Sequence, residues 1–341
     1  MGNFDNIIYT INNMSCWVVM LIFILTLTAL VYLYREFIKM QALKDESSKT
    51  NSDGSKKEGF TSSQELIMDE DSAGYLSKSG KDKYDKFYVE MYDKLFYDKL
   101  TNDYEVGVII NKCDPTIESD VLVIGSKTGS VVNTLANKGF NAYGLEESPT
   151  MLQYSMNKYP DDRFVLGSGS NSILFNPEKF TLIACLDFSI YSVKNRMALF
   201  DNCYRWLMPG GYLAIHLINP SSYFKEKRVI TNINKTIPIT KLFFNASSSK
   251  NSIDITEISL KEYNYKSTVQ ILPDNRIVQR ETFINKKNKK VRQNINNIKI
   301  DEPQVILSEA KDAGFNMLSQ TELTYVSKSH QYIYILYKPS L

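Results

Sequence analysis

The chain has 341 residues, of which 43% are hydrophobic and 23% are charged, a composition that suits one or two globular domains with a sizeable core. Its formal net charge of +2 gives no electrostatic argument for binding nucleic acid, so no nucleic-acid partner is expected. The cysteines have neither metal nor disulfide spacing, so we interpret them as buried thiols in a reducing compartment and expect no metal site. They are Cys16, Cys113, Cys185 and Cys203.

An uncharged run near the N-terminus predicts a membrane anchor. Residues 16–34 contain no Asp, Glu, Lys or Arg and are numerous enough to cross a bilayer as a helix. Asp5 precedes the run while Arg35 and Lys39 follow it, flanks that do not fit a cleaved signal peptide. The positive-inside rule then puts the short tail 1–15 across the membrane and residues 35–341 in the cytoplasm, as a single-pass protein. The alternative, a buried globular helix, would need a polar stripe that this run lacks.

Residues 35–81 are rich in Ser, Lys, Asp, Glu and Gly and read as a solvated, disordered linker. We therefore place a soluble domain at 82–341. At its start, aromatic and apolar residues recur every three or four positions over 84–100, which predicts one amphipathic helix that includes Tyr88 and Tyr92. A second helix is predicted at 104–112.

The stretch 120–152 has the pattern of one β-α-β unit. An apolar run at 121–124 ends in a turn that contains Gly125, a helical pattern follows, and a second strand ends on the acidic Glu146. Such a unit puts the turn and the carboxylate at the same edge of a parallel sheet, where open α/β folds bind ligands. A nucleoside-containing ligand is the first expectation. NAD is not expected, because the third and sixth turn positions of its glycine fingerprint are Lys127 and Ser130 here.

The remaining elements continue the alternation and then interrupt it. Strands are predicted at 163–166, 180–186 and 212–218, with a helix at 195–207, which gives a doubly wound α/β sheet. Residues 219–300 read as an antiparallel β insert, with alternating segments at 252–260, 266–272 and 276–285. The basic run 286–292 is interpreted as a hairpin tip rather than a nucleic-acid site. A helix at 303–313 and an antiparallel pair at 315–325 and 331–337 close the chain.

Two motifs in the central unit resemble those of a known superfamily. VLVIGSKTG at 121–129 and GLEESPTML at 144–152 are similar to the VLDLGCGTG and GIDxSPxML motifs of class I S-adenosylmethionine (SAM) dependent methyltransferases. The later L-x-PGG block and the closing strand pair fit the same pattern, so the resemblance covers about 84–339. It implies a Rossmann-like methyltransferase fold, SAM as cofactor, and a small-molecule or protein acceptor.

Three further blocks look like the membrane-anchored methyltransferase-like proteins of large DNA viruses. They are the F-Y-x-x-x-Y-D segment at 87–93, NCYRWLMPGGYLAIHL at 202–217 and the QYIYILYKP ending. This narrower resemblance implies a viral origin, with a virion or host endomembrane location.

The superfamily resemblance also implies a set of binding residues. Glu146 would accept hydrogen bonds from the ribose hydroxyls, and Gly125 and Gly129 would allow close backbone approach. The full cofactor-binding set is Gly125, Ser126, Lys127, Gly129, Glu146, Glu147, Ser168 and Asp187. Substrate candidates are Tyr88, Tyr92, Ser189, Tyr191, His216 and Asn219. No catalytic residue is assigned, because methyl transfer is an in-line displacement that depends mainly on positioning and desolvation.

Structural roles are the alternatives for several of these residues. The aromatic side chains at helical spacing would then be packing, and Asp187 would cap a turn. His216 shares its strand face with Ala214 and Ile218, which favours a structural histidine.

Three positions depart from the superfamily. Val123 replaces the usual acidic residue, Lys127 the middle glycine and Ser168 the acidic residue near adenine, while Thr181 is a weaker departure. Two unmade charged contacts at about 1.5–3 kcal/mol each would weaken SAM binding by roughly two to four powers of ten. Two hypotheses therefore stay open: an active methyltransferase, or an inactive pseudo-methyltransferase that acts as a structural or interaction module.

Overall fold

A computed structural model describes residues 17, 75–227, 246–247, 253–272 and 275–340. The chain divides into two compact units, 1–64 and 65–341, and every described residue except Trp17 belongs to the second. The predicted membrane helix at 16–34, apart from Trp17, and the predicted linker up to residue 74 lie outside the described residues. Within the described ranges, none of the helices combines the length and apolarity that a membrane crossing needs.

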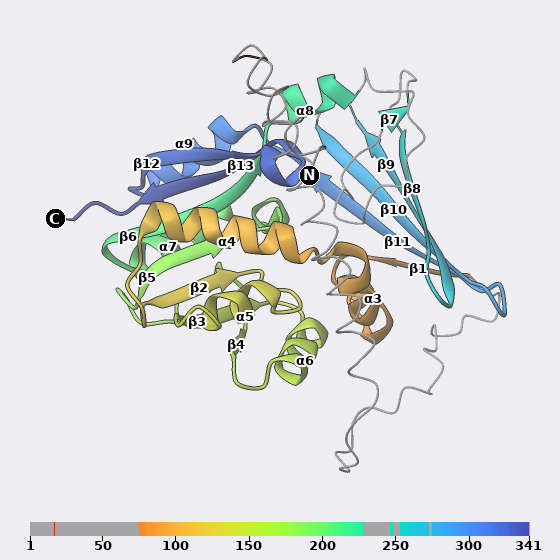
Figure 1. Ribbon diagram of the computed structural model, residues 1–341, viewed down its shortest axis with the longest axis horizontal. Coiled ribbons are helices and arrows are strands. Elements are labelled where there is room, and N and C mark those ends of the chain that lie inside the picture. Colours follow the sequence, from red (N-terminus) through yellow and green to blue (C-terminus); the bar gives the residue numbers. More distant parts are fainter. Residues whose placement is uncertain (1–16, 18–74, 228–245, 248–252, 273–274, 341) are drawn as a thin grey trace, which may run out of the picture. The chain divides into compact units, whose positions relative to one another are not determined.

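The larger sheet has seven strands in the order β12-β13-β6-β5-β2-β3-β4 (Figure 1). Parallel pairs join β2, β3, β4, β5 and β6, while β13 runs antiparallel to both β6 and β12. The strands are β2 (Asp120–Ile124), β3 (Asn141–Glu146), β4 (Arg163–Leu166), β5 (Phe180–Cys185), β6 (Leu207–Ile218), β12 (Asn316–Leu323) and β13 (Lys328–Tyr337). The predicted doubly wound sheet is confirmed.

Helices cover both faces of this sheet. The buried side chains of α4 (Lys99–Cys113) and α5 (Ser130–Ala136) share one core with Val121, Val123 and Ala184. On the other face, α7 (Arg196–Trp206) and α9 (Pro303–Asp312) pack in a second core that contains Trp206 and Phe180. α6 (Pro149–Lys158) follows β3, and α8 (Pro220–Lys227) follows β6.

The predicted antiparallel insert forms a second sheet in the order β1-β11-β10-β9-β8-β7 (Figure 1). Its strands are β7 (Ala246–Ser247), β8 (Ile253–Ser259), β9 (Tyr263–Ile271), β10 (Arg276–Asn285) and β11 (Val291–Lys299). The basic run does form the turn between β10 and β11, but β11 itself is an additional strand. β1 (Tyr75–Ser79) pairs parallel with β11 and lies within the segment predicted as linker, so the ordered domain includes residues before 82.

The aromatic helix predicted at 84–100 is wrong in its extent. A 3-10 turn at Gly80–Lys83 leads into α3 (Lys86–Phe96), and the chain is extended at Tyr97. The side chain of Asp98 then accepts a hydrogen bond from the Thr101 amide and begins α4. α3 packs Phe87 and Leu95 against Tyr265 and Phe283 of the insert, so it belongs to the core of the second sheet.

Candidate functional site

The loop between β2 and α5 is built on left-handed backbone. Gly125 and Gly129 have φ angles of 67° and 84°, and Gly129 caps the N-terminus of α5. A Cβ added to Gly125 would lie 2.6 Å from Ser189 Oγ, so only glycine fits against that neighbour. The amides of Gly125 and Ser126 both donate to the Leu145 oxygen, at 2.8 and 3.1 Å. These bonds tie the loop to the end of β3.

Glu146, the last residue of β3, points inward and is only 8% exposed. One carboxylate oxygen accepts the Lys127 amide at 2.8 Å and the other accepts the Ser148 amide at 2.9 Å. Burial raises the pKa of Glu146, and these amide bonds oppose that effect. A carboxylate oxygen has more than one acceptor direction, so both oxygens can still accept a hydroxyl.

Lys127 extends from this loop to the turn after β5. Its Nζ donates to the backbone oxygen of Asp187 at 3.0 Å, lies 3.5 Å from the Asp187 carboxylate, and is 6.0 Å from the centre of the Tyr92 ring. Its φ of 53° is a left-handed conformation, which explains why glycine is usual at this motif position. The ammonium therefore lies where the glycine loop faces the turn after β5.

Two buried hydroxyls beside the loop, Ser126 Oγ and Ser189 Oγ, make no hydrogen bond among the described residues. Buried polar atoms in folded proteins are normally satisfied. Ser189 Oγ lies against Gly125, whereas Ser126 Oγ lies against Gly144 of β3. Ser189 is therefore the hydroxyl on the side of the turn after β5.

A pocket of about 350 Å³ lies beside Glu147, between the segment Lys81–Asp85 and the start of α6. Glu147, Ser148 and the aromatic ring of Tyr84 line it, and Lys81 Nζ pairs with Glu147 at 2.6 Å. Burial alone would raise the pKa of the Glu147 carboxyl, but Lys81 and Ser168 together lower it. Glu147 and Ser168 therefore meet, as the motif positions implied, next to a pocket of the size that small ligands occupy.

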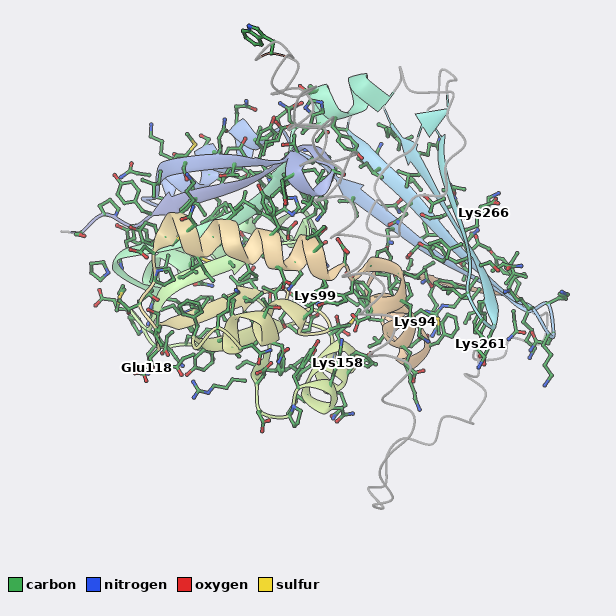
Figure 2. All side chains as sticks on the ribbon, in the orientation of Figure 1. Lys94, Lys99, Glu118, Lys158, Lys261 and Lys266 are labelled. Carbon is green, nitrogen blue, oxygen red and sulfur yellow. The ribbon has the colours of Figure 1, made fainter. Side chains whose placement is uncertain are left out.

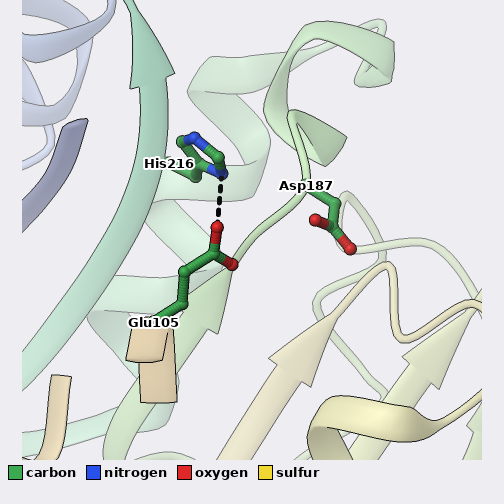
Figure 3. Close-up of side chains that lie close together, drawn as sticks. All are labelled: Glu105, Asp187 and His216. Carbon is green, nitrogen blue, oxygen red and sulfur yellow. Dashed lines mark ion pairs between the residues drawn. The ribbon is translucent and has the colours of Figure 1, made fainter. Parts of the chain in front are cut away.

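The turn after β5 brings Asp187 toward two side chains that lie far away in the sequence. Asp187 and Phe188 both have positive φ, 47° and 58°, and the Phe188 ring packs 4.3 Å from the His216 ring. Glu105 from α4 lies 3.8 Å from His216 Nδ1 and pairs with Lys328 at 2.7 Å. Figure 3 shows the Glu105 carboxylate directed at the His216 ring, with Asp187 to one side.

Burial and the positive charges around this group set its protonation. Burial and then Lys328 hold the pKa of His216 well below its usual range, and burial raises the pKa of Glu105. Burial alone would raise the pKa of the Asp187 carboxyl, but Lys127 and Lys328 lower it to about 2. The imidazole is therefore neutral and Asp187 ionised near pH 7. No sequence motif points to Glu105 or Lys328, because their partners are distant in the chain.

The two tyrosines predicted as substrate residues, Tyr88 and Tyr92, point to different places. Burial and then the charges of Asp187 and Glu146 raise the pKa of Tyr92 well above its usual range, which puts its hydroxyl near both carboxylates. Tyr88 instead donates to Glu281 of the insert at 2.7 Å, so it is a packing residue there.

Asp93 fixes α3 to the glycine loop. Its carboxylate accepts the Thr128 hydroxyl at 2.5 Å and pairs with Lys158 of α6, a side chain marked in Figure 2, at 2.5 Å. No sequence motif pointed to this residue, since a lone Asp on an amphipathic helix is ordinary.

The other predicted positions have structural partners. The Tyr191 hydroxyl accepts the Ile218 amide at 3.1 Å, Asn219 accepts the Ser222 amide, and Thr181 donates to the Asp120 oxygen. Val123 is buried in the core beneath α4 and α5, so an acidic residue there would enter an apolar environment.

The ribose side of a SAM molecule fits the inward carboxylate of Glu146, and the orphaned serine hydroxyls are suited to its polar tail. Lys127, which pairs with Asp187, and Ser189, which lies against Gly125, stand on the side of the loop toward the turn after β5. The residues present therefore fit the cofactor, provided the Lys127 side chain rotates.

Comparison with known proteins agrees with this geometry. A model of the methyltransferase domain family matches residues 122–215, which include β2, the glycine loop, Glu146 and most of β6. None of the curated protein sequences compared with the chain matches it.

Solved structures extend the likeness over most of the chain. The CcbJ methyltransferase from Streptomyces caelestis has a TM-score of 0.59 at 14% identity, covering 77% of this chain and 100% of that one. A SAM-dependent methyltransferase from Clostridium acetobutylicum has a TM-score of 0.55 at 17% identity, covering 74% and 98%. CalS10, an amino pentose methyltransferase from Micromonospora echinaspora, has a TM-score of 0.54 at 15% identity, covering 75% and 98%.

At these identities the structural matches establish the fold alone. Together with the domain match, they lead to one conclusion: the chain has the fold of these methyltransferases, and its residues 122–215 are similar to the methyltransferase domain family.

Proposed function

We propose that the domain binds SAM at the edge formed by the glycine loop and Glu146, and transfers its methyl group to a polar acceptor. The observation that carries the proposal is the Glu146 carboxylate, buried at the end of β3 and fixed by two backbone amides. A carboxylate held in this way is oriented before the ligand arrives, so little side-chain entropy is lost on binding.

The Lys127–Asp187 ion pair supplies a partner for each charge of the methionine tail. When Lys127 turns from Asp187 to the ligand carboxylate, Asp187 becomes available to the ligand ammonium. The exchange leaves the number of ion pairs unchanged or higher. The Lys127–Asp187 pair is partly exposed, with side-chain exposures of 23% and 50%, so breaking it costs about 0–1 kcal/mol. Asp187 would thereby replace the carboxylate that Val123 lacks.

SAM supplies an electrophilic methyl group bound to a sulfonium. The chain's own residues hold the ligand: Glu146 orients the ribose, Lys127 and Asp187 orient the tail, and α3 with Tyr92 excludes water.

Equilibrium dialysis of the full-length chain against SAM carrying a labelled methyl group tests the proposal. We expect saturable retention below 1 mM ligand, displaced by S-adenosylhomocysteine. Retention that does not saturate, or that S-adenosylhomocysteine leaves unchanged, would refute cofactor binding.

A second candidate, a pseudo-methyltransferase used as an interaction module, is favoured by one observation, the Lys127 ammonium beside Asp187. In that case the Lys127 side chain blocks the place of the methionine tail of SAM, and Lys127→Gly would create SAM binding that the natural chain lacks. We infer the first function because both tail charges have a partner in the same ion pair.

We further propose that residues 16–34 anchor this domain to a membrane as a single pass with the domain cytoplasmic, in a protein of viral origin located in a virion or host endomembrane. The uncharged run and its basic C-terminal flank support the anchor. The chain should stay with membranes after an alkaline carbonate wash, and a variant without residues 1–34 should be released. Release of both would contradict the anchor.

A further inference from the structure

Three side chains of metal-ligand type converge from three distant parts of the chain. Glu105 comes from α4, Asp187 from the turn after β5 and His216 from β6. Their ligand atoms all lie within 4.8 Å of one another, and Figure 3 shows Glu105 directed at His216 with Asp187 to one side. None of the three side chains is the ribose carboxylate Glu146, although Asp187 also contacts Lys127 of the glycine loop.

The imidazole of His216 makes no well-formed hydrogen bond to another described residue. His216 is 0% exposed, and neither ring nitrogen makes a hydrogen bond within the described ranges. Nδ1 faces Glu105 at 3.8 Å, beyond hydrogen-bond distance, while the Gln331 side chain lies close enough to His216 to oppose the lowering of its pKa. A buried imidazole whose ring nitrogens lack a well-formed hydrogen bond is unfavourable by about 1–3 kcal/mol, and a bound cation would satisfy the nitrogen that faces Glu105.

The turn that carries Asp187 is strained. Asp187 and Phe188 are consecutive residues at positive φ, and a bulky aromatic residue adopts that region rarely. Such conformations persist where the surroundings enforce them, and they concentrate at binding sites. Here the strained turn directs Asp187 and the Phe188 ring toward His216.

Two lysine side chains next to these carboxylates determine how a cation could bind. Lys328 pairs with Glu105 Oε1 and Lys127 approaches Asp187 Oδ2, so two carboxylates already face two ammonium groups. Each contact uses one oxygen, and a carboxylate has two. Both lysine side chains are partly exposed, at 15% and 23%, so both can move outward. A cation must therefore compete with the lysines.

We propose that Glu105, Asp187 and His216 form a binding site for a divalent first-row transition metal ion, with Zn²⁺ the best fit. One imidazole and two carboxylates suit Zn²⁺ or Mn²⁺, whereas Ca²⁺ and Mg²⁺ prefer oxygen donors alone. The Asp187 side chain is half exposed, so the site is accessible from solvent on that side. The site does not depend on SAM binding, although the two ligands share Asp187.

The sequence makes the test selective, because the chain has two histidines, His216 and His330. The full-length chain, free of SAM, is titrated with Zn²⁺ by calorimetry. We expect one site with a dissociation constant in the micromolar range, weakened at least thirtyfold in His216→Gln and unchanged in the matched control His330→Gln. Lys328→Met, which removes the competing ammonium, should bind Zn²⁺ about tenfold more tightly.

A second measurement avoids dependence on the folding of His216→Gln. In the natural chain with ¹⁵N-labelled histidine, Zn²⁺ should shift the signal that persists in His330→Gln. Absence of saturable Zn²⁺ binding, equal loss in both histidine variants, or a shift confined to the His330 signal would overturn the proposal. Because SAM is absent throughout, a negative result here leaves the cofactor test untouched.

Discussion

Lys127 Nζ lies 3.0 Å from the backbone oxygen of Asp187 and 3.5 Å from its carboxylate, which joins the glycine loop to the turn after β5. The two residues are 60 positions apart, and both adopt left-handed backbone that a side chain makes unfavourable. The pair stands at the point where a ligand reaching from Glu146 toward β6 would have to pass.

Lys127→Met separates the two candidate functions. Methionine keeps the length and the backbone strain of the lysine but removes its charge, so the ligand carboxylate loses its partner. We expect the SAM dissociation constant to rise about tenfold, equivalent to roughly 1.4 kcal/mol. Calorimetry measures this dissociation constant. A lower value in Lys127→Met than in the natural chain would show that the Lys127 side chain blocks SAM binding.

Asp93→Ala should loosen α3 without unfolding the domain. The substitution removes both the Thr128 hydrogen bond and the Lys158 ion pair. We expect amide hydrogen exchange in Lys86–Phe96 to become roughly tenfold faster, because local opening no longer breaks these contacts. The control is Lys94→Ala on the same helix, an exposed residue labelled in Figure 2. Equal rates in the two variants would show that Asp93 does not fasten the helix.

Arg292→Met tests how the insert holds the N-terminal segment. Arg292 is fully buried and contacts both Asp85 oxygens, at 2.8 and 2.7 Å, and the Lys83 oxygen. Removing one member of a buried charged pair usually costs about 3–5 kcal/mol. Denaturant unfolding should show that loss, whereas Lys266→Met, at an exposed pair on β9, should change stability by less than about 0.5 kcal/mol. A similar small change in both variants would contradict a structural role for Arg292.

Glu281→Gln should alter the pH dependence of stability. Glu281 is fully buried and accepts hydrogen bonds from Tyr88 and Tyr265, and burial raises its pKa although those bonds oppose the shift. The folded state thus binds this proton more tightly than the unfolded chain, whose glutamates titrate near about 4.3, and stability is lost as pH rises through the folded pKa. Glutamine does not ionise. The melting temperature of the variant relative to the natural chain should therefore increase from pH 5 to pH 7, and a constant or falling difference would show that the sign is wrong.

The parts of the fold that follow local rules were predictable from the sequence. The apolar run at 121–124, the glycine turn and the acidic end at Glu146 place β2, β3 and the loop correctly, because each depends on neighbours within one β-α-β unit. β4, at Arg163–Leu166, matches its predicted bounds.

Elements that depend on distant partners were missed. β1 is five residues long and is stabilised by pairing with β11, more than two hundred residues away. The buried face of β11 carries Arg292, Asn294 and Asn296, so the apolar alternation that predicts a strand is missing. The break at Tyr97 was missed because the aromatic periodicity continues across it.

The residues of the candidate site also fall into those that local sequence predicts and those that depend on distant partners. Glu146 and the glycines follow from motif position, whereas Glu105 meets Lys328 across 223 residues and could not be paired from spacing. Tyr88 and Tyr92 are one helical turn apart and looked equivalent, yet the fold directs one into the insert and the other toward Lys127.

The most direct test of the central claim is the affinity of S-adenosylhomocysteine for the full-length chain and for Glu146→Gln, measured by isothermal titration calorimetry beside Glu118→Gln, a substitution at an exposed carboxylate labelled in Figure 2. Losing the charge-assisted contacts to the ribose, worth about 1.5–3 kcal/mol, should weaken binding roughly 10- to 150-fold in Glu146→Gln and leave Glu118→Gln unchanged. Absence of heat at millimolar ligand in the natural chain, or equal affinity in all three proteins, would contradict an adenosine site at the end of β3.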